Sequence, residues 1–255
     1  MPSRLPQVSF AALLPNAVTL LSLCSGLTAI RFATQAKWEH VLIALFVAAL
    51  CDTLDGRIAR MLKATSQFGA ELDSLADVVS FGVTPAVILY LWTLNDAGPL
   101  GWVAVLCFAC CGALRLARFN VALDDPNPPP YAAHFFTGVP IPAGAGLAML
   151  PLVLSLGLVE NRLGTLAQQH WFIVPWTLLV AGLMVSRVPT YSFKKLKVPR
   201  DTALFILLGI VLLTALLITK PWLGMALILM AYLISLPLSY LHHRKLARAF
   251  ASHSA

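Results

Sequence analysis

The fold of this chain is decided by the stretch Asp52-Thr53-Leu54-Asp55-Gly56-Arg57-Ile58-Ala59-Arg60, which continues through Gly69, Asp73 and Asp77. The two acids of the first stretch are three residues apart and the last two are four apart, so each pair shares a helix face. Two such helices lying side by side would aim four carboxylates at one point. Carboxylates that close stay ionised only beside a cation, and oxygen ligands favour Mg²⁺ or Mn²⁺.

Acidic residues near helix ends are often only solvated caps, and these aspartates could have that simple role. It suits one aspartate better than four on two adjacent apolar segments, in a chain with only 11 acidic residues among 255. Acids inside or at the edge of membrane segments are functional by default. The glycines at 56 and 69 also remove side chains beside the acids, which would let a ligand approach the backbone.

The composition predicts a polytopic membrane protein. Hydrophobic residues make up 59% of the chain and charged residues 11%, whereas soluble domains carry about 25% charged residues. The mean hydropathy is +0.81. The net charge of +7 comes from short basic clusters between apolar segments. That pattern is typical of orientation signals and lipid headgroup contacts and argues against a nucleic-acid partner.

The apolar stretches predict an all-α protein with about eight transmembrane helices, since a span needs about 20 apolar residues. They lie at about 16–30, 38–61, 69–94, 100–120, 139–159, 171–187, 202–219 and 222–241. A proline-rich loop is predicted at 124–130, because successive prolines cannot continue a helix. We expect a single transmembrane catalytic domain over 1–255, with a core at about 12–190 and two further helices at about 202–241.

Lysine and arginine positions predict the orientation. Most of the 18 basic residues fall on one side of this eight-span topology. The positive-inside rule places that side in the cytoplasm, together with both termini and the aspartates. No cleavable signal peptide is expected, because the short N-terminus leads into a segment long enough to span. We therefore expect an integral protein of a bacterial inner membrane whose active site faces the cytoplasm.

The spacing of the aspartate stretch resembles the signature of the CDP-alcohol phosphotransferase family, D-x2-D-G-x2-A-R-x8-G-x3-D-x3-D. All eight specified positions match: Asp52, Asp55, Gly56, Ala59, Arg60, Gly69, Asp73 and Asp77. Four further motifs, at 71–77, 81–85, 115–120 and 136–142, resemble the phosphatidylserine synthase branch. The resemblance runs from about Pro15 to about Gly146, and the C-terminal third matches only in being hydrophobic.

The resemblance implies the CDP-alcohol phosphotransferase fold and transfer of a phosphatidyl group from CDP-diacylglycerol to L-serine, giving phosphatidylserine and CMP. It implies two divalent ions, Mg²⁺ or Mn²⁺, bound by Asp52, Asp55, Asp73 and Asp77, with Asp77 also the favoured general base. It implies nucleotide and diphosphate contacts at Gly56, Ala59, Arg60, Gly69, Asn16 and Thr19. Membrane lipids and a second copy, in a homodimer, are the other expected partners.

Three polar residues near the end of the fourth segment, Arg115, Arg118 and Asn120, are candidates for binding the acceptor. The arginines either extend to the lipid headgroups and set the topology, or turn inward and bind an anion. That anion would be the lipid diphosphate or the serine carboxylate, and arginine suits both through paired hydrogen bonds.

Two other functions are compatible with the aspartates. The same chemistry could use another acceptor, glycerol 3-phosphate or inositol phosphate, although these need a more basic pocket. An ion transporter could instead use the four aspartates as a site at the membrane midplane. Against a transporter, the acids lie at a junction of segments beside a basic cluster, not at the centre of a span.

Overall fold

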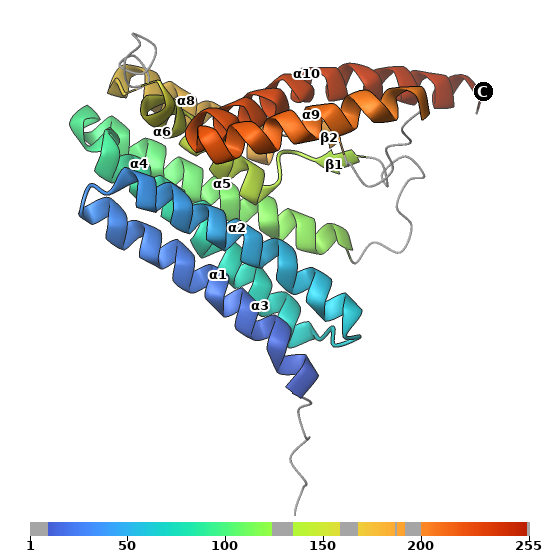
Figure 1. Cartoon of the computed structure of the whole chain (residues 1–255), viewed down its shortest axis with the longest axis horizontal. Helices are drawn as coiled ribbons and strands as arrows, with labels where there is room; N and C mark the ends of the chain where they lie inside the picture. Colours follow the sequence, from blue (N-terminus) through green and yellow to red (C-terminus); the bar gives the residue numbers. More distant parts are fainter. Residues whose placement is uncertain (1–9, 124–134, 159–167, 187, 192–199, 254–255) are drawn as a thin grey trace, which may run out of the picture. The chain divides into compact units, whose positions relative to one another are not determined.

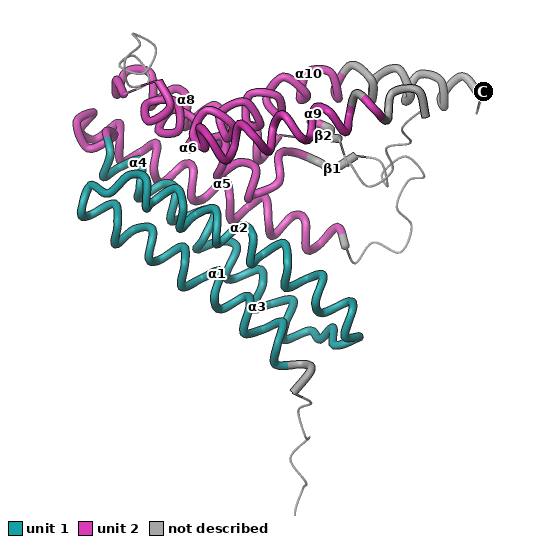
Figure 2. Tube along the Cα trace, in the orientation of Figure 1, with its two compact units in different colours: residues 1–92 teal, residues 93–255 magenta. Residues whose placement is uncertain are grey.

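The computed structural model describes residues 10–123, 135–158, 168–186, 188–191 and 200–253. The chain divides into two compact units, Met1–Trp92 and Thr93–Ala255 (Figure 2). Almost every described element is a helix (Figure 1). The loop predicted at 124–130 lies outside the described residues, and a single catalytic domain over the whole chain stays a prediction.

The first unit is built from α1 (Phe10–Thr34), α2 (Trp38–Met61), α3 (Gln67–Asp77), the π-helix η1 (Val78–Val83) and α4 (Thr84–Trp92). Helix α1 packs against α2, α3, η1 and α4, and these helices lie side by side in Figure 1. Small residues such as Ala29, Ala33, Ala44 and Ala48 are buried between the helices. Small side chains let helix backbones approach closely where lipid gives no hydrophobic drive between helices.

Serine hydroxyls fix α1 against α2. Ser22 Oγ donates to the carbonyl of Ala48 at 2.9 Å, and Ser25 Oγ donates to the carbonyl of Ala44 at 2.8 Å. The partners run in opposite directions along the two helices, as expected for an antiparallel pair joined by a short turn. Because each bond joins particular residues, the two helices cannot slide past one another without losing both.

The turn from α2 to α3 is closed at both ends by capping interactions. Lys63 has a φ of 51°, and the amide of Ala64 donates to the carbonyl of Ala59 at 2.9 Å. This is the bond of a Schellman motif, in which a left-handed residue ends the helix. Ser66 then caps α3, its Oγ accepting from the amide of Gly69 at 3.0 Å. The turn therefore fixes where α3 starts relative to the end of α2.

A π-helix interrupts the third predicted segment directly after Asp77. The η1 residues Ser80, Phe81 and Gly82 are buried. A β-carbon placed on Gly26 of α1 would lie 3.0 Å from Ser80 Oγ and 3.1 Å from Ser80 Cα, so glycine permits this close approach. Isolated π turns inside α-helices occur frequently at functional sites.

The second unit contains the remaining elements. They are η2 (Leu94–Ala97), α5 (Pro99–Leu123), β1 (Phe135–Thr137), α6 (Ile141–Gly157), α8 (His170–Val185), β2 (Pro189–Tyr191), α9 (Arg200–Thr219) and α10 (Pro221–His253). Helix α8 packs against α5 and α6, and α10 packs against α6, α9 and β2. The two short strands pair antiparallel, with Phe136 opposite Thr190. This pair of strands is a departure from the predicted all-helical chain.

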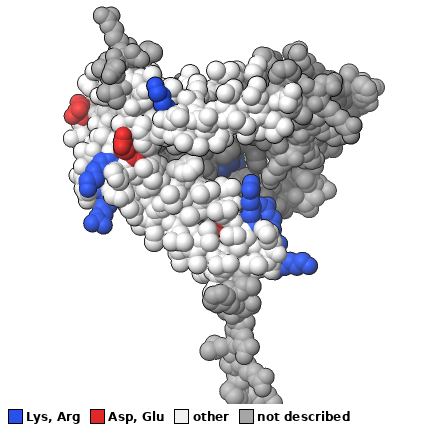
Figure 3. All heavy atoms as spheres, in the orientation of Figure 1, with Lys and Arg blue, Asp and Glu red and all other residues white. Residues whose placement is uncertain are grey.

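The described part of each predicted apolar segment is mainly helical, with the third divided among α3, η1 and α4, but length and composition qualify only four of the described helices as membrane spans. These are Leu13–Thr34, Gln67–Trp92, Pro99–Ala122 and Pro221–Tyr240. Figure 3 shows a face that is largely uncharged, with few basic and acidic side chains. The protein is therefore an integral membrane protein, while eight spans and cytoplasmic termini stay predictions.

Candidate metal centre

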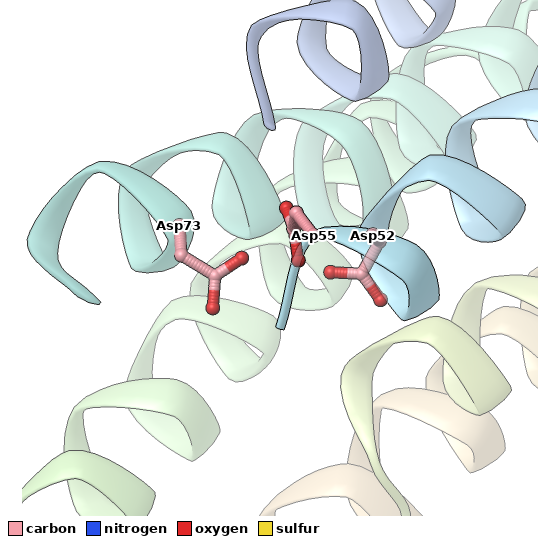
Figure 4. Close-up of side chains that lie close together, drawn as sticks. All are labelled: Asp52, Asp55 and Asp73. Carbon is pink, nitrogen blue, oxygen red and sulfur yellow. The ribbon is translucent and has the colours of Figure 1, made fainter. Parts of the chain in front are cut away.

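Three of the predicted metal ligands meet in the first unit. Asp52 and Asp55 project from α2 and Asp73 from α3, and one carboxylate oxygen of each lies within 4.8 Å of those of the other two. Figure 4 shows the three carboxylates turned towards a common space. Asp55 is only 4% exposed, whereas the other two are partly exposed.

Local sequence explains this arrangement. The three-residue spacing on α2 puts both of its acids on one face, and the capped turn at residues 62–66 returns the chain so that α3 starts nearby. Three carboxylates at this separation repel one another unless a cation lies among them. Three hard oxygen donors suit a divalent ion such as Mg²⁺ or Mn²⁺. The residues present therefore fit the metal that the sequence predicted.

Asp77, the fourth predicted acid, lies next to this group. It is the last residue of α3, one helical turn beyond Asp73, and its carboxyl shares a hydrogen bond with the carboxyl of Asp52. Its oxygens are not among those within 4.8 Å of one another. The structure thus brings all four predicted acids together, with Asp77 at the side of Asp52.

The residues predicted to contact the nucleotide from α1 lie against the two acidic helices. Thr19 Oγ1 donates to Asp55 Oδ2 at 2.7 Å. Asn16, one turn earlier, has its Oδ1 3.0 Å from where a β-carbon on Gly69 would stand. Sequence reasoning missed the bond between Thr19 and Asp55, since the two residues are 36 positions apart and nothing in the spacing pairs them.

The two signature glycines have different surroundings. A β-carbon placed on Gly69 would lie 3.0 Å from Asn16 Oδ1 and 3.1 Å from Ser66 Oγ, so this glycine serves the close packing of α1 on α3. A β-carbon placed on Gly56 would have no atom within 4 Å. Gly56 and Arg60 are exposed and Ala59 is partly exposed. This face of α2 is therefore open beside the carboxylates.

The three candidate acceptor residues lie on α5 in the second unit. Arg115 is 6% exposed, and its guanidinium carbon lies 5.1 Å from the centre of the Phe119 ring. Arg118 is partly buried and donates from Nη1 to the carbonyl of Val185 at 2.8 Å and from Nη2 to the carbonyl of Ser186 at 3.1 Å. Asn120 is partly exposed. Neither arginine therefore extends fully into solvent, as a residue that served only to set the membrane topology would.

Gly138 packs closely against the same end of α8 that Arg118 contacts. Its φ is +77°, and a β-carbon there would lie 2.6 Å from the carbonyl oxygen of Met184 and 2.8 Å from that of Ser186. Arg118 and Gly138 belong to two of the motifs singled out in the sequence, 115–120 and 136–142. The structure brings both motifs to the C-terminal end of α8, where helix carbonyls need donors.

Comparison with known proteins agrees with this geometry. The family model described as CDP-alcohol phosphatidyltransferase matches residues 12–188, across both compact units, and the model described as CDP-alcohol phosphatidyltransferase 2 matches residues 202–237. The chain is 40% identical over 239 residues to the CDP-diacylglycerol–serine O-phosphatidyltransferase of Mycobacterium leprae (strain TN), which covers 92% of this chain and 77% of that protein.

Two more distant relatives carry the same name. The protein of Helicobacter pylori (strain 26695) is 34% identical over 223 residues, covering 87% of this chain and 88% of that protein. The protein of Bacillus subtilis (strain 168) is 31% identical over 182 residues, covering 71% of this chain and 92% of that protein. Because the family model matches residues 12–188, most of this chain, and the relatives are this similar, the chain belongs to the CDP-alcohol phosphatidyltransferase family.

Proposed function

We propose that this protein transfers the phosphatidyl group of CDP-diacylglycerol to L-serine, giving phosphatidylserine and CMP. The observation that carries the proposal is the meeting of three family-signature carboxylates, from α2 and α3, within 4.8 Å. The relatives named CDP-diacylglycerol–serine O-phosphatidyltransferase support serine as the acceptor. We place the reaction at the cytoplasmic face of a bacterial inner membrane, where the positive-inside rule puts the aspartates.

Asp52, Asp55 and Asp73 would hold a divalent cation, Mg²⁺ or Mn²⁺, and Asp77 would complete a second metal site. A cation there would neutralise the charge of the diphosphate and stabilise the departing phosphate. The open face of α2 at Gly56, with Ala59 and Arg60, would accept the cytidine and diphosphate, and Asn16 and Gly69 are the other proposed contacts.

In a direct displacement, the serine hydroxyl oxygen forms a bond to the phosphorus that carries the diacylglycerol. The bond between that phosphorus and the bridging oxygen breaks, and CMP leaves with the electron pair. Asp77 is the proposed acceptor of the hydroxyl proton, since it ends α3 at the edge of the carboxylate group. Coordination to a cation would lower the basicity of Asp77, so the base role and the role in a second metal site compete, and Asp77→Asn separates them.

The acceptor's carboxylate needs a cationic partner, and Arg115, Arg118 and Asn120 are the proposed contacts. Arg118 already donates from both terminal nitrogens to backbone carbonyls. Arg115 is buried beside Phe119, and both arginines stay proposed contacts for the carboxylate. A homodimer is also proposed, from the family resemblance alone.

The proposal is tested with purified protein, CDP-diacylglycerol and a panel of acceptors, measuring CMP release and the lipid product. We expect serine to be used, and glycerol 3-phosphate and inositol phosphate to be poor acceptors. A chelator should stop the reaction, and Asp52→Asn and Asp73→Asn should abolish it without loss of the folded protein. Preference for a phosphorylated acceptor would change the assignment, and an ion transporter would release no CMP.

A further inference from the structure

The hydrogen bonds of Thr19 on α1 differ from those of four exposed threonines on other turns and helices. Thr28, Thr53, Thr214 and Thr219 each donate to the carbonyl four residues earlier, at 2.7–2.9 Å. Thr19 has that carbonyl, of Pro15, at 3.1 Å and the carboxylate of Asp55 at 2.7 Å. A hydroxyl has one proton to donate, and a bond to a carboxylate is shorter and stronger than one to a neutral carbonyl.

The bond is also enclosed. Thr19 and Asp55 are each 4% exposed, so water does not readily replace either partner. Thr19 belongs to a row on α1 with Ser22 and Ser25, spaced three residues apart, and all three donate to α2. The serines bond to backbone carbonyls, whereas Thr19 bonds to a side chain of the metal centre.

From this geometry we infer that Thr19 is a positioning residue for Asp55, which it holds in the orientation that presents a free carboxylate oxygen to a divalent cation. The inference rests on the proposed metal site. A carboxylate has two oxygens, so the one that accepts from Thr19 leaves the other for the metal. Hydrogen-bond partners of ligating side chains typically account for about 10- to 100-fold in metal affinity. The nucleotide contact predicted for Thr19 stays a prediction, and with its one proton engaged the hydroxyl would make that contact as an acceptor.

The inference is tested by titrating Mn²⁺ into the purified full-length protein in nanodiscs and following free Mn²⁺ by its paramagnetic resonance signal. Thr19→Val keeps the shape of the side chain and removes the donor, and we expect it to weaken Mn²⁺ binding about 10- to 100-fold. Thr19→Ser retains a hydroxyl and should bind nearly as the original protein does. Thr28→Val is the matched control, because it makes the same substitution on the exposed side of α1.

Asp55→Asn separates this inference from the proposed function. If Asp55→Asn weakens Mn²⁺ binding and Thr19→Val does not, the positioning role is overturned while the metal site stands. If Asp55→Asn binds Mn²⁺ as tightly as the original protein, both fall together. Should Thr19→Val fail to fold, Thr19→Ala removes the donor without a branched side chain, and the same comparison applies. Turnover by Thr19→Val should recover at high metal concentration, which a fault in folding would not allow.

Discussion

Gly56→Ala tests whether the open face of α2 is where the substrate lies. Gly56 is exposed inside a helix, and a β-carbon there meets no atom within 4 Å. In the absence of substrate, alanine should therefore stabilise the helix by about 0.8–1 kcal/mol, the usual difference between glycine and alanine. If the cytidine diphosphate packs against this surface, the new methyl group occupies its space.

Overpacking of this kind typically costs about 1–3 kcal/mol, which corresponds to a fall of about 5- to 150-fold in kcat/KM for CDP-diacylglycerol. The assay is CMP release at varied CDP-diacylglycerol and fixed serine, together with thermal unfolding of the same samples. Gly209→Ala is the matched control, since Gly209 is also exposed in a helix, on α9, with no atom within 4 Å of a β-carbon. A stabilised Gly56→Ala enzyme with unchanged kcat/KM would refute the placement.

Three further predictions concern the base, the α8 end and the acceptor. Asp77→Asn should abolish turnover but leave CDP-diacylglycerol binding within about tenfold, and complete loss of binding would make Asp77 chiefly a metal ligand. Gly138→Ala should lower the free energy of unfolding by about 2–4 kcal/mol, because a β-carbon would strike two carbonyl oxygens at 2.6 and 2.8 Å and the backbone is left-handed; an unchanged thermal midpoint would contradict this. Arg115→Ala should raise KM for serine about 10- to 150-fold, and an unchanged KM would remove Arg115 from the acceptor site. Arg118→Ala should also lower the thermal midpoint, because it removes two hydrogen bonds to the end of α8.

The helices were predictable because their signal is long and local. Apolar runs bounded by turns predicted all eight segments, and the bounds of α2, Trp38–Met61, agree with the predicted range. Helix α10 continues to His253, well beyond the predicted end at 241, because a helix can extend past its apolar part into polar sequence. The strands β1 and β2 were missed, since three residues each are too few to show an alternating pattern.

The carboxylate group was also predictable, because fixed spacing on two helices joined by a short turn leaves few arrangements. What the spacing could not supply was the partner of each polar side chain. Nothing local distinguishes Thr19, which bonds to Asp55, from Thr28, which bonds to its own helix. For Arg118, the sequence predicted either a lipid headgroup or an anion as the partner. In the structure it donates to backbone carbonyls at the end of α8, about 67 positions away.

The π turn at Val78–Val83 has a consequence for how this chain tolerates change. An α-helix advances about 100° per residue, so a π turn, which accommodates one additional residue, rotates the helix after it by about that angle relative to the helix before it. The π turn therefore sets the direction of Asp73 and Asp77 on α3 separately from the direction in which the apolar face of α4 packs. Removing Val78, Val79 or Ser80, which lie between the motifs at 71–77 and 81–85, would restore a regular helix and leave both motifs intact. Either the acids of α3 or the apolar face of α4 would then point in the wrong direction. The number of residues between Asp77 and Thr84 is therefore a requirement of the fold in its own right.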